Sequence, residues 1–217
     1  MGNLFLDRFN SAPINPVPFP HLYVDGIFPV DFYSRMVDSL PAQSQMLPIG
    51  EVRGKAMKKY PQRYVFLFTW LKNLEPVRRE FWRGFISDLT SKETMAGILG
   101  KFGIPEKPVW PDVHLIHDLE GYALGPHTDA KAKVASLLFY LPKESGSEHL
   151  GTSLYTPREE MAPSTEHFPF EKFNRVATMP YAPNAMFAFA RSDSSFHGVE
   201  PVEKADRWLL QYNINAA

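Results

Sequence analysis

The chain has 217 residues and a formal net charge of −1, and its apolar fraction of 44% is that of an ordinary globular protein. With so little net charge, we expect no nucleic-acid partner and no association with an anionic membrane surface. The absence of cysteine excludes disulfides, zinc–thiolate sites, iron–sulfur clusters and cysteine nucleophiles. No secretory leader and no apolar run of membrane-spanning length is recognisable, so we expect a cytoplasmic protein. Nothing in the sequence indicates an oligomeric state.

The first half of the chain predicts an extended entry followed by helices. Residues 11–20 are rich in proline and predict an extended segment, and residues 21–28 predict a short strand. Residues 30–40 and 73–90 predict helices, with a shorter helix at 92–99 and a proline-interrupted loop at 42–64. The helical stripes are Phe32, Met36, Val37 and Leu40 in the first helix, and Leu74, Val77, Phe81, Phe85 and Leu89 in the second.

From about residue 110 onward, the hydrophobic period changes to two and turn residues recur, which indicates strands. The predicted strands are 112–118, 121–128, 133–141, 152–156, 175–179, 184–190, 195–200 and 207–214. Short strands that follow N-terminal helices favour an α+β, mainly β fold, in which supporting helices pack outside a jelly-roll barrel, also called a double-stranded β-helix. We expect one domain over 1–217, with an entry segment and helices at 1–110 and the jelly-roll core at 111–217.

The sequence GPHTDA contains a candidate metal-binding pair. His127 and Asp129 are two residues apart, and residues i and i+2 of a strand point to the same face. His197, in SSFHGVEPV, lies in a late predicted strand and supplies a second imidazole. Two histidines and one carboxylate leave coordination positions open, as a non-haem iron(II) oxygenase requires. A zinc hydrolase would also tolerate these ligands, but it needs a general base, and the sequence has no His-Glu-x-x-His helix.

Arg207 starts the last predicted strand, RWLLQYNI, ten residues after His197. An inward-facing arginine near the metal would be a buried charge, which is costly without a partner. A dicarboxylic co-substrate supplies that partner, because one end can chelate iron while the distal carboxylate accepts hydrogen bonds from the guanidinium.

Three stretches together resemble the iron(II)/2-oxoglutarate-dependent dioxygenase superfamily, specifically its prolyl 4-hydroxylase-like branch. They are GYALGPHTDAKAKVASLLFYLP, FAFARSDSSFHGVEPV and RWLLQYNI, and PFPHLYVDGIFP is similar to the entry strand of that branch. The resemblance covers residues 112–214 well and 18–40 loosely.

The resemblance implies iron ligands at His127, Asp129 and His197, which are also the catalytic centre, with 2-oxoglutarate and dioxygen as co-substrates. It implies that Arg207 binds the distal carboxylate of 2-oxoglutarate. Tyr140 matches a position that helps to hold that carboxylate, and Ser136 matches a polar position nearby. Either His117 or Asp118 falls beside the co-substrate.

The primary substrate is expected to be a small molecule, with an amino acid or a peptidyl residue as alternatives, and the default reaction is hydroxylation of a C–H bond with release of succinate and CO2. Asn213 is expected near the substrate, and its departure from the tryptophan of peptide-acting members disfavours a peptidyl substrate. Lys131 and Arg191, together with Lys133, are weaker candidates for contact with an anionic substrate. The segments 42–64 and 143–174 are long for loops, so we predict that both border the metal cavity.

A second function class stays open from the sequence. A metal-dependent jelly-roll protein of cupin type, such as an isomerase or a sugar-binding module, would share the strand pattern and a metal site. That class gives Arg207 no role, so the function of this arginine separates the two hypotheses.

Overall fold

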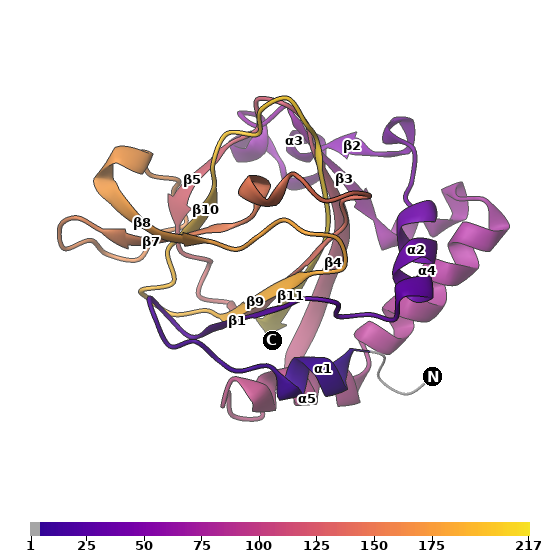
Figure 1. Ribbon diagram of the computed structural model, residues 1–217, viewed down its shortest axis with the longest axis horizontal. Coiled ribbons are helices and arrows are strands. Elements are labelled where there is room, and N and C mark those ends of the chain that lie inside the picture. Colours follow the sequence, from indigo (N-terminus) through magenta and orange to yellow (C-terminus); the bar gives the residue numbers. More distant parts are fainter. Residues whose placement is uncertain (1–4) are drawn as a thin grey trace.

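The computed structural model describes residues 5–217 and contains two antiparallel β-sheets with α-helices gathered beside them (Figure 1). Among these residues, no helix combines the length and the apolar character that crossing a membrane requires.

The larger sheet has seven strands, and every neighbouring pair is antiparallel. Its spatial order is β1 (His21–Val24), β9 (Met186–Ala190), β6 (Lys133–Tyr140), β11 (Arg207–Ala216), β4 (Val109–Asp118), β3 (Arg63–Leu67) and β2 (Leu47–Pro48). The smaller sheet has the order β5 (Leu124–His127), β10 (His197–Val199), β7 (Ser153–Pro157) and β8 (Phe173–Thr178). The strands from β4 to β11 thus pass repeatedly between the two sheets, as in a jelly-roll-type fold. All eight strands predicted after residue 110 are present, with different ends.

The helices precede the jelly-roll strands in the chain. They are α1 (Leu6–Ser11), α2 (Val30–Asp38), α3 (Ile49–Arg53), α4 (Pro76–Leu89) and α5 (Lys92–Lys101). Short 3₁₀ turns lie between them at Gln43–Gln45, Lys55–Met57 and Phe68–Asn73. Two more 3₁₀ turns, Glu148–Leu150 and Phe170–Lys172, lie between later strands. Pro76 suits the first position of α4, where its missing N–H has no helical acceptor. Ser91 caps α5 by accepting a hydrogen bond from the Thr94 backbone N–H at 3.1 Å.

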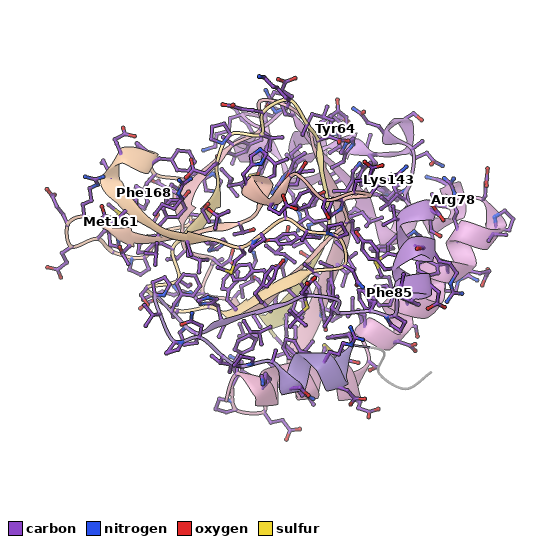
Figure 2. All side chains as sticks on the ribbon, viewed as in Figure 1. Tyr64, Arg78, Phe85, Lys143, Met161 and Phe168 are labelled. Carbon is purple, nitrogen blue, oxygen red and sulfur yellow. The ribbon has the colours of Figure 1, made fainter. Side chains whose placement is uncertain are left out.

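The helices cover the outer face of the larger sheet. Alternate residues of β6 and β11 point outward into one hydrophobic core with the helices, and they include Leu137, Phe139, Leu210, Tyr212 and Ile214. The helical side of this core is mostly aromatic, with Phe28, Phe32, Trp82 and Phe85 in edge-to-face and tilted contacts. Figure 2 shows Phe85 among the helices, while Met161 and Phe168 lie at the opposite end of the molecule.

The other residues of the same strands face the smaller sheet. On β11 they are Arg207, Leu209, Gln211 and Asn213, and on β6 they are Ser136, Leu138 and Tyr140, all brought together by the register Asn213↔Ser136 and Leu209↔Tyr140. Because side chains alternate along a strand, the pairing that packs the outer core also directs these polar residues inward.

Two expectations for the first half of the chain were wrong. Residues 42–64 do not form a simple loop, since they contain β2, α3 and the start of β3, and β3 extends the sheet by pairing Arg63 with Asp118. In the sequence, prolines 48 and 61 and the basic residues between them hide the hydrophobic periods that would have indicated a helix and strands here. In the expected stripe of the second helix, Leu74, Phe85 and Leu89 are buried, but Val77 is 82% exposed and Trp82 is buried in addition. The helix α1 was not predicted.

The orientation of α4, with Phe85 buried and Val77 exposed, leads to a test of the outer core. Phe85→Ala should lower the free energy of unfolding by about 3–5 kcal/mol, because it removes a buried ring that the surrounding aromatics cannot replace. Val77→Ala, in the same helix, should change it by less than about 0.5 kcal/mol. Urea denaturation of both variants measures the difference, and equal losses would contradict the observed helix orientation.

Candidate metal centre

Three side chains that can bind a metal converge between β5 and β10. His127 ends β5, Asp129 follows two residues later, and His197 starts β10, directly opposite His127 in the register of the two strands. One candidate ligand atom from each residue lies within 4.8 Å of the others, and all three residues are buried. The convergence expected from the His-x-Asp spacing and the late histidine is therefore present.

Both imidazoles are oriented by the backbone two residues before them. Nδ1 of His127 lies 3.1 Å from the carbonyl oxygen of Gly125, and Nδ1 of His197 lies 3.0 Å from that of Ser195. A carbonyl can only accept, so each Nδ1 donates its proton and each Nε2 keeps a free lone pair. Burial lowers the pKa of His127 and of His197, and the proximity of the two rings lowers that of His127 further. Both rings are therefore neutral at physiological pH, the state that metal binding needs.

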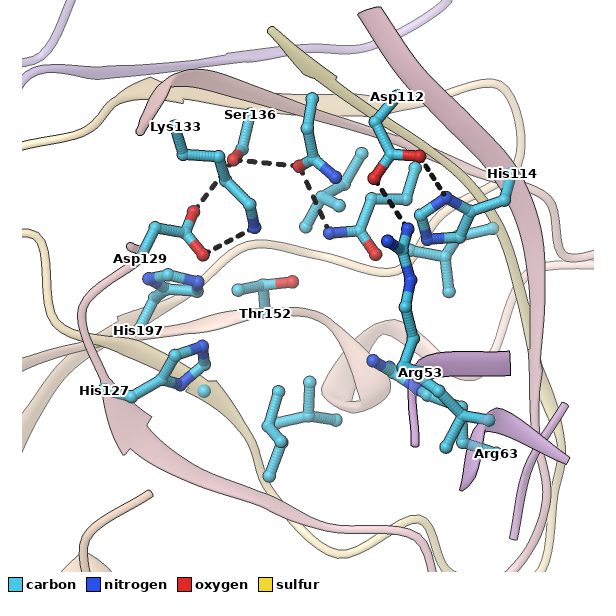
Figure 3. A pocket seen from close by; sticks show the side chains of 18 of the residues that line it. Arg53, Arg63, Asp112, His114, His127, Asp129, Lys133, Ser136, Thr152 and His197 are labelled. Atoms are coloured by element: carbon cyan, nitrogen blue, oxygen red, sulfur yellow. Dashed lines mark hydrogen bonds and ion pairs between the residues drawn. The ribbon is translucent and has the colours of Figure 1, made fainter. Parts of the chain in front are cut away.

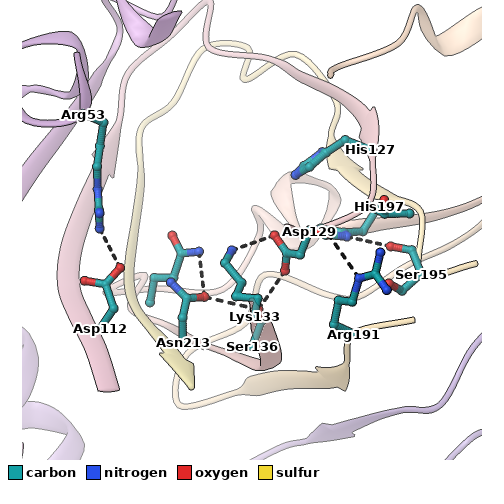
Figure 4. A network of polar contacts seen from close by, with 12 residues as sticks. Arg53, Asp112, His127, Asp129, Lys133, Ser136, Arg191, Ser195, His197 and Asn213 are labelled. Carbon is teal, nitrogen blue, oxygen red and sulfur yellow. Dashed lines mark hydrogen bonds and ion pairs between the residues drawn. The ribbon is translucent and has the colours of Figure 1, made fainter. Parts of the chain in front are cut away.

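Asp129 is held as an ionised carboxylate. Lys133 donates to its Oδ1 at 2.6 Å and Ser136 donates to its Oδ2 at 2.9 Å (Figure 4). Burial alone would raise the pKa of Asp129, but the Lys133 ammonium and the two nearby imidazoles hold it well below its ordinary value. Two neutral Nε2 atoms and one carboxylate form a donor set that suits iron(II) and leaves other coordination positions open.

The triad lies in the wall of a cavity of about 390 Å³ between the two sheets (Figure 3). Leu124, Leu138, Phe189 and Leu209 give part of its lining an apolar character. Both long segments reach it, as predicted: residues 42–64 contribute Ile49, Arg53, Met57 and Arg63, and residues 143–174 contribute Thr152 and His167.

Arg207 also lines this cavity and is only 1% exposed. Its Nη1 donates to Asp118 Oδ2 at 2.8 Å, and its Nη2 donates to the Thr152 hydroxyl at 3.3 Å. Arg63 binds the same carboxylate through two hydrogen bonds of 2.6 and 2.8 Å. Two guanidinium groups thus share one buried carboxylate, which leaves one positive charge unmatched. Within residues 5–217, Nε of Arg207 has no hydrogen-bond partner.

Ser136, Tyr140 and His117 were expected around the co-substrate, and the structure places them at different distances from the cavity. Ser136 lines the cavity beside Asp129, while Tyr140 lies beneath Arg207, whose guanidinium carbon is 5.7 Å from the Tyr140 ring centre. The Tyr140 hydroxyl accepts a hydrogen bond from the Thr152 backbone N–H. His117 does not face the cavity. Its ring stacks on Trp208 with centroids 3.9 Å apart and its Nε2 lies 2.6 Å from Asp206, so the inward residue of the ambiguous pair is Asp118.

The weaker substrate candidates are also separated by the structure. Asn213 lines the cavity, with its Oδ1 3.2 Å from the Ser136 hydroxyl. Lys131 is exposed and lies outside the cavity lining. Arg191 is also outside the lining, because it pairs with Asp193 at 2.6 Å and donates to the Asp129 backbone carbonyl at 3.3 Å. Lys133, two residues after Lys131, is the lysine that reaches the site.

Sequence reasoning missed several residues that line the cavity, among them His167 and Arg63. His167 lies in the long segment 143–174 and has no motif around it, but its ring lies 4.5 Å from that of His127 and it hydrogen-bonds to the Tyr60 hydroxyl. Burial lowers the pKa of His167 to about 4, so it is neutral. Arg63 lies in the segment 42–64, which was predicted to be a loop, and was not singled out as a site residue. Neither residue has a local motif, because its position depends on where a long segment returns to the barrel.

No protein-family model matches the sequence, and no curated protein matches it. Solved structures do match the fold. An oxidoreductase of the 2OG-Fe(II) oxygenase family from Burkholderia pseudomallei has a TM-score of 0.55 and 14% identity, with 90% of this chain and 84% of that chain covered. A prolyl-4-hydroxylase from Pseudomonas putida has a TM-score of 0.54 and 14% identity, and both chains are covered completely.

HygX from Streptomyces hygroscopicus, solved with nickel and 2-oxoglutarate bound, has a TM-score of 0.55 and 12% identity, with 98% and 86% covered. At these sequence identities, the structural similarity establishes the fold alone. The chain therefore has the fold of 2-oxoglutarate- and iron(II)-dependent oxygenases, including that of a prolyl 4-hydroxylase.

Proposed function

We propose that the protein is a non-haem iron(II)- and 2-oxoglutarate-dependent dioxygenase, in which His127, Asp129 and His197 hold the metal. One observation carries the proposal: two neutral imidazoles with free Nε2 atoms and one ionised carboxylate converge within 4.8 Å on a cavity that also contains a buried arginine. In this proposal the two sheets form a double-stranded β-helix, and residues 1–217 act as one domain with the catalytic core at 111–217.

When bound, iron(II) supplies the activation of dioxygen, which couples conversion of 2-oxoglutarate to succinate and CO2 with hydroxylation of a substrate C–H bond. The protein's own part is to hold and orient the reactants. The backbone carbonyls of Gly125 and Ser195 fix the two imidazoles, and Ser136 and Lys133 fix the carboxylate. Apolar residues such as Phe189, whose ring lies 4.6 Å from that of His197, exclude water beside the metal ligands.

The unmatched positive charge around Asp118 supports a dicarboxylic co-substrate. A buried guanidinium without an anion is costly, and the carboxylate of Asp118 balances only one of the two arginines that flank it. The distal carboxylate of 2-oxoglutarate would balance the other and would meet the Thr152 hydroxyl and the unpartnered Nε of Arg207. The 2-oxoglutarate bound in HygX, a protein of the same fold, supports this choice of diacid.

The buried position of Arg207 in the same cavity favours the oxygenase over a cupin-type isomerase or sugar-binding module, which has no use for this charge. The substrate is proposed to be a small molecule or an amino acid, or a peptidyl residue as in a prolyl hydroxylase, and Asn213 lies where it would line the substrate space.

The metal site is tested by the absorption of the anaerobic protein. Addition of iron(II) and 2-oxoglutarate should produce a visible charge-transfer band, and admission of air should release succinate. His197→Ala should abolish both, because it removes one of the ligands that hold iron. His149→Ala removes an exposed histidine of the same chain and should retain both signals. A wild-type protein that gives neither the band nor succinate would refute the assignment.

The role of Arg207 is tested by pairing a protein change with a ligand change. Arg207→Met should weaken 2-oxoglutarate binding by ~10- to 100-fold, because it removes charge-assisted hydrogen bonds to the distal carboxylate. The change leaves Asp118 paired with Arg63, so no buried carboxylate loses its last partner.

Binding of 2-oxobutyrate, which lacks the distal carboxylate, should differ little between the variant and the wild type. Titration of the visible band measures both ligands, and Arg83→Gln, on the exposed surface of α4, is the control. An equal loss for both ligands would place Arg207 outside the diacid site.

A further inference from the structure

The wall of the cavity that faces the metal triad is polar and has no assigned role. It is built by Arg53 at the end of α3, by Asp112 and His114 on β4, and by Gln211 and Asn215 on β11. Figure 4 shows Arg53 and Asp112 across the cavity from His127, Asp129 and His197. A substrate that reaches the metal from this side would be held by this wall.

Two neighbouring atoms on the wall, one of His114 and one of Asp112, are placed to accept hydrogen bonds from a ligand. Nδ1 of His114 and Oδ1 of Asp112 lie 3.7 Å apart, too far for a good hydrogen bond, and Nδ1 is buried without a partner within the described residues. Burial lowers the pKa of His114, so its imidazole is neutral, and in the tautomer with the proton on Nε2 its Nδ1 accepts a hydrogen bond from a ligand. The Asp112 carboxylate is ionised, because the Arg53 guanidinium, 2.6 Å from its Oδ2, helps to keep its pKa below the ordinary value despite partial burial. A cationic donor of a ligand that approaches both atoms from the cavity would serve both acceptors.

Donors without acceptors lie next to this pair. Nη2 of Arg53 donates to Asp112 Oδ2 at 2.6 Å, and the remaining N–H groups of this guanidinium have no partner among residues 5–217. Nδ2 of Asn215, a residue that is 7% exposed, is also buried without a partner in this part of the chain. These donors suit a carboxylate of the ligand, and both lie next to Asp112 in the fold: Arg53 is its ion-pair partner, and Asn215 lies two residues beyond Asn213, which pairs with Asp112 in the sheet.

We propose that this wall binds the primary substrate by the head group of a free α-amino acid. Its ammonium group would lie between Asp112 and His114, and its carboxylate would bind Arg53 and Asn215. The inference rests on the proposed oxygenase function and names its substrate class. An internal peptidyl residue has neither a free ammonium nor a free carboxylate, so the wall would reject it, because its own charged groups would then stay unpaired.

Binding is measured first without turnover. The protein is loaded anaerobically with manganese(II) and 2-oxoglutarate, and thermal shift and calorimetry are recorded with the common L-α-amino acids. Each acid is compared with its α-hydroxy analogue and with its N-acetyl and amide derivatives. At least one free amino acid should raise the melting temperature, and each blocked derivative of it should bind ~10-fold more weakly or worse, since a charge-assisted hydrogen bond is lost. The same acid should accelerate succinate release by the iron(II) enzyme.

Two variants separate the charges of the head group. Asp112→Asn should reduce the preference for the amino acid over its hydroxy analogue by ~10-fold or more, because the anion that selects an ammonium is removed. Arg53→Gln should weaken both ligands by ~10- to 100-fold, because both carry the carboxylate. Lys55→Gln changes the same charge two residues away, on an exposed position outside the cavity lining, and is the matched control.

The outcomes distinguish this inference from the function beneath it. If the visible band with iron(II) and 2-oxoglutarate forms but no free amino acid binds, or if blocked derivatives bind as well as free ones, the substrate class is wrong and the oxygenase proposal stands. If the band itself does not form, the oxygenase proposal fails. A hydroxy analogue that binds more tightly than the amino acid would overturn the role given to Asp112.

Discussion

The site depends on the register of β11, the central strand of the larger sheet. It pairs with β4 along ten residues and with β6 along most of its length, so its two faces are set by neighbours on both sides. Leu210, Tyr212 and Ile214 are committed to the core under the helices, and the residues between them must face the cavity. A slip of one residue would bury Arg207 among aromatic rings and expose the outer core. The large apolar core therefore fixes where the polar groups of the cavity point.

The same register explains why three buried charged residues, here called the floor of the cavity, are tolerated: Arg63, Asp118 and Arg207. Arg63, Asp118 and Arg207 occupy matched positions on three adjacent strands, so the carboxylate lies between its two cations without distortion. Removing an ion from water costs several kcal/mol, and a single pair of opposite charges would offset most of that cost. The extra guanidinium makes the floor stable with an anion and unfavourable without one. This is the behaviour expected of a binding site, because a purely structural network would end in neutrality.

The sequence could predict features that depend on local residue spacing, but not features that depend on tertiary packing. His127 and Asp129 are recognisable because strand geometry places residues i and i+2 together, and the predicted strands after residue 110 were confirmed because alternation is a local property. Arg63, Arg53 and His167 were not recognised as site residues, because each belongs to a long segment whose return to the barrel is decided by tertiary packing. The choice between His117 and Asp118 required the register, since a shift of one residue exchanges the two faces of β4. Val77 was misplaced because successive i+4 steps drift around a helix, so Val77 lies away from the face that holds Phe85 and Leu89.

Lys133 shows how the site is prepared before a metal arrives. Without it, burial would favour protonation of Asp129, and a protonated acid is a poor ligand for iron(II). The ammonium lies four residues along the chain, and the Lys133 side chain is 20% exposed. A carboxylate offers about four lone pairs, of which Lys133 and Ser136 use two, so metal binding and these hydrogen bonds are compatible. The hydrogen bonds then spread the negative charge of Asp129 and weaken it as a donor, while the backbone carbonyls strengthen both imidazoles. In the proposed site, the two histidines would therefore be the stronger anchors of the metal, and the carboxylate would be the ligand whose strength the surrounding side chains control.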